Sequence, residues 1–99
     1  MMKFSVRVSE YQKKAMLNIC DAEILGKKIV QDELTMHISE AYYGERIVET
    51  EEAKSLLKNS SIINMVGNDT VSMAVDLGVG SQNGVKIIAG VPFLIVFNI

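Results

Sequence analysis

The chain has 99 residues, of which 48% are apolar and 22% are charged, and its net charge is −2 at pH 7. This composition excludes a disordered chain, and the length predicts one compact domain over residues 1–99. No apolar run approaches the roughly 20 residues of a membrane-spanning helix, and the single cysteine, Cys20, has no partner for an internal disulfide, so we expect a cytoplasmic protein without a membrane role.

Charge is distributed unevenly along the chain. Residues 1–28 carry six basic and three acidic side chains, whereas residues 29–58 carry seven acidic and three basic ones. Nucleic-acid-binding domains usually carry a net basic charge, because much of their affinity comes from neutralised phosphates. The net acidic charge therefore disfavours RNA as a partner, while a local basic face remains open.

The pattern of the first third of the chain predicts a β-hairpin. Strict alternation of polar and apolar residues predicts a strand over residues 3–9, residues 10–14 form a turn, and residues 15–20 form the return strand. Basic side chains gather on the polar side of the first strand and in the turn. We expect four of them to contact a partner: Lys3, Arg7, Lys13 and Lys14.

The middle of the chain mixes short elements. Asp21 is expected to cap a helical turn over residues 22–25 that ends at Gly26, and residues 27–30 and 34–39 read as extended segments. Residues 40–45 are expected to form a loop. Its adjacent aromatics, Tyr42 and Tyr43, are candidates for partner contact, because exposed aromatic side chains often anchor interfaces.

Two helices are predicted in the second half. Thr50 is expected to cap the first, and residues 59–61 end it. Residues 61–78 then form a strand-turn-helix unit: strand 62–66, Gly67 in the turn, Asn68 or Asp69 as the cap, and a helix that closes at Gly78. A helix N-terminus favours anions, but Asp69 in the first turn would repel one, so turn geometry explains Gly67.

Residues 85–89 and 93–97 are predicted to form a closing hairpin around residues 90–92. The last strand is apolar on both sides, so we expect it to be central and covered on both faces. The elements together predict an α+β fold, a single compact domain with a mostly antiparallel or mixed sheet of about five to six strands and two main helices. Two short helices cover only one face of such a sheet, which favours a homodimer or a protein partner on the other.

Residues that carry chemistry are few. Cys20 and His37 are the only thiol and imidazole and fall on separate predicted segments, which favours a buried thiol and a solvated histidine over a nucleophile and its base. A single cysteine and a single histidine also do not provide the paired ligands at short spacing that are typical of a zinc site. We predict no metal, no cofactor and no catalytic residue, and whether the chain is an enzyme stays open, with a non-enzymatic role favoured.

A polar cleft is the alternative site. Asp21 follows directly on a predicted strand and can project toward the polar residues of the later strand-turn-helix unit. The candidate binding residues are Cys20, Asp21, Asn64, Gly67 and Asn68.

Several segments, in the same order and over nearly the whole chain, resemble an archaeal family known as domain-of-unknown-function family 424. They are residues 20–27 (CDAEILGK), 42–45 (YYGE) with Val48 and 51–53 (EEA), 64–67 (NMVG), and 88–92 (IAGVP). In that family a histidine often follows the Gly-Val-Pro segment, where this chain has Phe93. The resemblance implies an archaeal, cytoplasmic, compact α+β protein and no particular reaction.

Three functions remain open from the sequence. The leading hypothesis is a non-enzymatic interaction module, accessory to RNA or to the translation machinery, that contacts its partner through the basic face. The second is a small-molecule-binding protein or enzyme that uses the polar cleft around Cys20, Asp21, Asn64 and Asn68. The third is a homodimeric structural protein built on the apolar C-terminal strand.

Overall fold

The computed structural model describes residues 2–98, and within them it contains eight strands, three α-helices and two short 3-10 helices. The strands are β1 (Lys3–Tyr11), β2 (Lys14–Asp21), β3 (Lys28–Gln31), β4 (Leu34–His37), β5 (Arg46–Glu49), β6 (Ile62–Val66), β7 (Lys86–Ile88) and β8 (Val91–Phe97). The helices are α1 (Glu40–Tyr43), α2 (Thr50–Asn59), α3 (Asn68–Asp76), η1 (Ala22–Ile24) and η2 (Gln82–Gly84).

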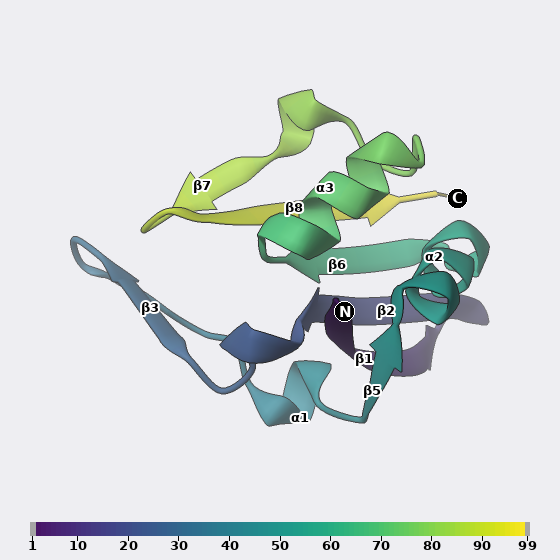
Figure 1. Cartoon of the computed structure of the whole chain (residues 1–99), viewed down its shortest axis with the longest axis horizontal. Coiled ribbons are helices and arrows are strands. Elements are labelled where there is room, and N and C mark those ends of the chain that lie inside the picture. The colour runs from purple at the N-terminus through teal and green to yellow at the C-terminus, as the bar shows by residue number, and fades with distance from the viewer. Residues whose placement is uncertain (1, 99) are drawn as a thin grey trace.

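Six strands form one mixed sheet in the order β5-β1-β2-β6-β8-β7, and β3 and β4 form a separate hairpin beside it (Figure 1). The central pair, β2 and β6, is parallel, while the other neighbouring pairs are antiparallel. This confirms the predicted α+β fold, with its mixed sheet of five to six strands and its two main helices, α2 and α3.

The predicted N-terminal hairpin is present, with longer strands than expected. Gln12 and Lys13 alone make the turn, and both have positive φ angles, of 51° and 67°. Such a two-residue turn matches the twist of the flanking strands, so pairing continues up to Tyr11 and Lys14.

One prediction in the middle of the chain is wrong, and one strand there has no predicted counterpart. Residues 40–43 form α1 and not a loop, because the Ser39 hydroxyl accepts a hydrogen bond from the Tyr42 N–H at 3.2 Å and the Gly44 N–H closes the turn on the Glu40 carbonyl. The edge strand β5 was not predicted, since four residues with polar ends carry too little alternation to be recognised.

The helix boundaries shift by one residue at their starts. Thr50 is the first residue of α2 and not its cap, and Gly67 occupies the cap position of α3 in place of Asn68 or Asp69. The predicted end of α3 is confirmed: Gly78 has φ +75°, and the Val79 N–H reaches back to the Ala74 carbonyl at 2.9 Å.

Helices α2 and α3 pack on one face of the sheet, and the main core lies between them and the strands (Figure 1). Every second residue of the central strands points into this core. Its sheet side consists of Phe4, Val6, Leu17, Ile19, Ile63, Met65 and Leu94, and its helix side includes Ala53, Leu57, Val71 and Ala74.

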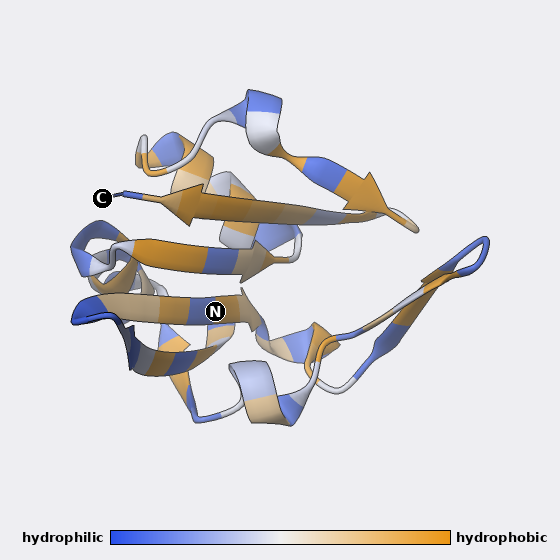
Figure 2. Ribbon diagram, turned by 180° about the vertical axis from the view of Figure 1, so that it is seen from behind, coloured by the Kyte–Doolittle hydropathy of each residue, from blue (hydrophilic) through white to orange (hydrophobic). Residues whose placement is uncertain are grey.

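The intervening residues point to the opposite side, which we call the open sheet face: Arg7, Ser9, Tyr11, Lys14, Met16, Asn18, Ile62, Asn64, Ile95 and Phe97. Figure 2 views the molecule from this side, where β8 is largely hydrophobic and one hydrophilic band interrupts β6. The prediction that β8 is covered on both faces is wrong for the single chain, because Ile95 and Phe97 are 61% and 64% exposed. No helix in the described residues is long and apolar enough to cross a membrane.

The two faces of the sheet should differ in their contribution to stability. Ile63 points into the core with no exposed surface, whereas Ile95 on the adjacent strand is 61% exposed. We expect Ile63→Ala to lower the free energy of unfolding by about 2–5 kcal/mol. The matched control, Ile95→Ala, should lower it by less than about 1 kcal/mol in the same urea titration. Equal losses at the two positions would contradict this assignment of the faces.

Candidate functional site

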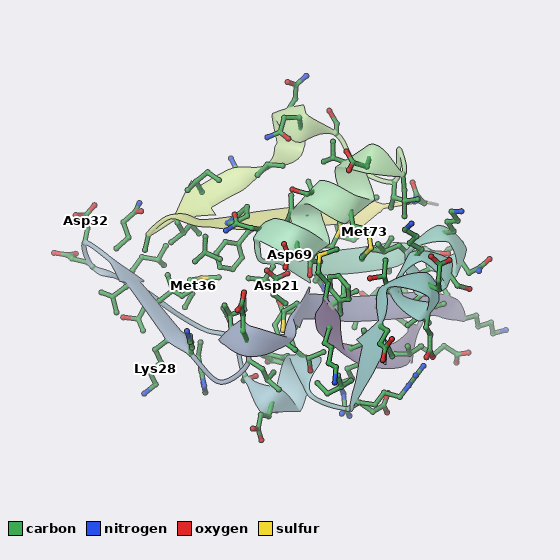
Figure 3. All side chains as sticks on the ribbon, in the orientation of Figure 1. Asp21, Lys28, Asp32, Met36, Asp69 and Met73 are labelled. Carbon is green, nitrogen blue, oxygen red and sulfur yellow. The ribbon has the colours of Figure 1, made fainter. Side chains whose placement is uncertain are left out.

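Asp21 lies at the junction of β2 and α3. Its carboxylate accepts three hydrogen bonds from the first turn of α3: from the Asp69 N–H at 3.1 Å, the Thr70 N–H at 2.8 Å and the Thr70 hydroxyl at 2.7 Å. Asp21 is only 4% exposed, and Figure 3 shows it beside Asp69 at the start of the helix. A residue distant in the sequence therefore caps α3, and Asp21 makes no side-chain cap for η1, the helical turn that follows it.

Gly67 makes room for this carboxylate. Its φ of +110° disfavours any residue with a β-carbon, and a β-carbon there would lie 2.6 Å from Oδ1 and 2.7 Å from Oδ2 of Asp21. The structure thus brings two of the candidate site residues, Asp21 and Gly67, into contact, and both are needed for the join between β2 and α3.

Cys20 points away from Asp21, to the other side of the sheet. It is fully buried among Ile29, Ile38 and Val66. Burial, together with the nearby charge of Asp21, raises the pKa of its thiol to about 12. The thiol therefore stays protonated at neutral pH, and His37, its one imidazole candidate, is exposed on β4.

Asn64 belongs to the open sheet face and not to the Asp21 site. Its Nδ2 donates to Asn18 Oδ1 at 2.7 Å, and Asn18 Nδ2 donates in turn to the Tyr42 carbonyl at 3.0 Å. These two hydrogen bonds hold the Asn64 amide in place on the central strand β6 and connect α1 to the sheet. Asn68 is exposed in the first turn of α3, so the four residues of the expected polar cleft do not line one cavity.

Three carboxylates meet near the start of α3. Asp21, Glu23 and Asp69 can each offer an oxygen within 4.8 Å of the other two, and Glu23 and Asp69 are exposed. Both oxygens of Asp21 already accept hydrogen bonds from α3. Coordination of a cation by this carboxylate would therefore compete with the capping of the helix.

The basic residues of the N-terminal hairpin are only partly together. Arg7 and Lys14 point from β1 and β2 to the open sheet face, and Lys13 lies in the turn beside them. Lys3 points the same way at the far end of β1, opposite Glu49 of β5. Of the two candidate aromatics, Tyr42 is exposed on α1, whereas Tyr43 is half-buried against the cluster that surrounds Cys20.

The sequence did not predict a groove that borders the open sheet face. It has a volume of about 420 Å³ and lies where β4 and α1 face β6, β7 and β8. Its principal lining residues are Met36, Tyr43, Asn64, Lys86, Phe93 and Ile95. We call it the β8 groove. The only signal in the sequence is that β8 is apolar on both sides.

The tip of the β3–β4 hairpin is anchored across this groove. Gln31 Oε1 at the end of β3 accepts a hydrogen bond from the Ala89 N–H at 2.6 Å, in the turn between β7 and β8. Figure 3 shows Met36 pointing from the hairpin toward the body of the protein. Two hairpins that are distant in the sequence thus hold the groove between them.

Two comparisons with known proteins find similarity over nearly the whole chain. The family model described as Protein of unknown function (DUF424) matches residues 9–99. A crystal structure of an uncharacterized conserved protein from Methanopyrus kandleri is similar in fold, with a TM-score of 0.78 and 22% sequence identity over 98% of this chain and 94% of that chain. No curated protein matches the sequence significantly.

The contact between Asp21 and Gly67 predicts a coupling in stability. Gly67→Ala and Gly26→Ala both place a β-carbon at positive φ, but only at Gly67 does it meet a neighbour within 4 Å. We expect Gly67→Ala to cost at least about 1 kcal/mol more than Gly26→Ala in chemical unfolding.

The Asp21→Ala variant should itself cost about 1–2 kcal/mol through loss of the cap. In that background, the difference between the Gly67 and Gly26 variants should shrink, because the crowding carboxylate is gone and only the cost of the Gly67 backbone angles, φ 110° and ψ 156°, remains. A difference that persists unchanged would show that Gly67 is needed for another reason.

The buried Cys20 and Tyr43 predict a loss of stability in alkali. Burial raises the pKa of Cys20 from 9.0 to about 12 and that of Tyr43 from 10.0 to about 12. The folded protein therefore holds protons that the unfolded chain releases, so stability is full below pH 9 and falls as the pH rises toward 12. Urea unfolding at a series of pH values should show this decline in the free energy of unfolding. In Cys20→Ala, the decline between pH 9 and 10 should be shallower than in the unmodified protein. An equal decline in both proteins would contradict the contribution assigned to Cys20.

Proposed function

This chain belongs to the DUF424 family, and we propose that it is a non-enzymatic binding module whose open sheet face contacts single-stranded RNA. One observation carries the proposal. On the side of the sheet away from α2 and α3, this face leaves Ile95 and Phe97 of β8 more than half exposed and carries Arg7 and Lys14 on β1 and β2, across the central strand β6.

The charge of this face supports an anionic partner. Its ten residues carry two charged side chains, those of Arg7 and Lys14, and both are basic, while Lys3 and Glu49, which point the same way at the edge of the sheet, are opposite in charge and adjacent in register. The acidic groups of α2 and α3, including Glu51 and Glu52, belong to the helices that pack on the other side. The net charge of −2 is thus an average over unlike faces, and it argues less strongly against RNA than the composition alone suggests.

The exposed apolar and aromatic side chains support an unpaired strand over a duplex. Proteins that bind single strands combine a basic track for the backbone with side chains on which bases stack. Phe97 and Tyr11 are exposed on this face, and Tyr42 is exposed on the adjoining α1. A single buried thiol, Cys20, fits a reducing compartment, so we place this binding in the cytoplasm.

A second copy of the chain fits this face less well. Two identical faces meeting around a two-fold axis would bring Arg7 and Lys14 of both copies into one interface, and the acidic side chain that points the same way, Glu49, lies at the edge strand β5 in register with Lys3. Catalysis is also less well supported, because the one candidate nucleophile, Cys20, is fully buried and its pKa is about 12.

We test the proposal with single-stranded RNA of about 12 nucleotides, within the site sizes of such proteins, by fluorescence anisotropy. Binding should weaken steeply between about 50 and 200 mM salt. The double variant Arg7→Glu/Lys14→Glu should bind at least about tenfold more weakly and show a shallower salt dependence, by about 0.7 in the log–log slope for each lost phosphate contact.

The matched control is Lys54→Glu/Lys58→Glu, which changes the net charge equally but lies on α2. It should lose much less affinity than the first double variant. Equal losses would mean that only the total charge matters, and an absence of salt-sensitive RNA binding by the unmodified protein would overturn the proposal. Salt-sensitive binding of an acidic polypeptide, without binding of RNA, would indicate a protein partner.

A further inference from the structure

We propose that the β8 groove receives one unpaired base of the bound strand, with Asn64 as its hydrogen-bonding partner and Lys86 beside the attached phosphate. This inference rests on the proposed function, because it assigns a specific subsite to a strand that lies on the open sheet face. The groove adjoins that face directly, since Asn64 and Ile95 belong to both.

The dimensions and walls of the groove suit a planar, largely apolar group. Its volume of about 420 Å³ lies at the lower end of the range for small-ligand sites, about 300–1,000 Å³. Tyr43 and Phe93 contribute aromatic rings, and Met36 and Ile95 contribute flexible or branched apolar contacts. Nucleobases stack on aromatic side chains of this kind, and stacking tolerates any base because each has a π face.

The polar groups in the groove are those a nucleotide needs. Asn64 is the one polar residue of β6, and its Nδ2 is held by Asn18 while its Oδ1 has no protein partner among the described residues. Amide side chains recognise base edges by such hydrogen bonds. Because Asn18 is itself fixed by the Tyr42 carbonyl, the Asn64 amide is oriented before any ligand arrives.

The one cation of the groove lies at its outer strand. Lys86 is exposed on β7 and pairs in register with Phe93, so its ammonium lies on the same side of the sheet as the proposed stacking ring. The lining residues of the groove include no carboxylate. An anionic group next to the base therefore meets an attractive charge and no repulsive one.

Alternative occupants explain fewer of these features. A purely apolar side chain from a partner protein would leave the Asn64 amide unmatched, which costs free energy when water is excluded. A second copy would bring Lys86 and Arg7 of both molecules into one interface and leaves the Asn64 amide unexplained. An unpaired base with its phosphate uses the rings, the amide and the ammonium together.

The experiment compares two ligands of equal charge: a single-stranded RNA of about 12 nucleotides, and the same sugar–phosphate chain without bases. The unmodified protein should bind the base-bearing strand at least about tenfold more tightly. Ile95→Trp fills the groove and should reduce this ratio by about fivefold or more, because the larger loss falls on the base-bearing strand. Removal of base stacking has effects of this size.

The matched control is Ile87→Trp. Ile87 is 59% exposed, close to the 61% of Ile95, but it does not line the groove. This variant should keep the full ratio. Asn64→Leu provides a second test that does not depend on filling the groove, and it should also lower the ratio once its folding has been checked by urea unfolding.

The outcomes separate the two proposals. If Arg7→Glu/Lys14→Glu weakens both ligands equally while the groove variants keep the wild-type ratio, the open sheet face binds the strand but the groove inference is overturned. If neither ligand binds in a salt-dependent way, the proposed function fails and the groove inference fails with it. A ratio lost in Ile95→Trp and in Asn64→Leu, but kept in Ile87→Trp, supports the subsite.

Discussion

The carboxylate of Asp21 is the contact on which the join between sheet and helix depends. From the end of β2 it accepts hydrogen bonds from N–H groups at the start of α3 that have no partner within the helix, so the position of the helix is tied to the central parallel pair of strands. Gly67 is required in the same place, because the carboxylate occupies the volume of a side chain. Helix α3 then covers the main core on one side of the sheet. The opposite side is contacted by α1, the β3–β4 hairpin and solvent.

This division gives the two sides different chemistry. The helix side holds the large apolar residues and, on the helices themselves, four of the twelve acidic ones: Glu51, Glu52, Asp69 and Asp76. The open side carries polar and basic residues from β1 and β2 and apolar ones from β8. A sheet buried on one side and solvated on the other usually shows polar residues on the solvated strands. β8 departs from this pattern, and this departure is the strongest indication in the fold that another molecule covers the open sheet face.

The sequence predicts those elements whose signal is local. Alternation in Lys3–Ser9, the glycine at 78 and the apolar run of Ile62–Val66 each determine a strand, a helix end or a strand without help from the rest of the chain. It fails where the cause is distant. Asp21 looks like the cap of the turn that follows it, but its partner is a helix that begins far along the chain. The β8 groove is assembled from six elements, and the pairing of Asn18 with Asn64 depends on a register that no local pattern contains.

The parallel pairing of β2 with β6 requires a long connection, residues 22–61, and this connection carries the β3–β4 hairpin, α1, β5 and α2. The β8 groove therefore has two origins. Its floor, with Asn64 and Phe93, belongs to the sheet, whereas its outer wall, with Met36 and Tyr43, belongs to the connection. Changes in the length or composition of the connection can reshape the wall without disturbing the floor, so relatives with the same sheet have a route to different ligand preferences through this one insertion.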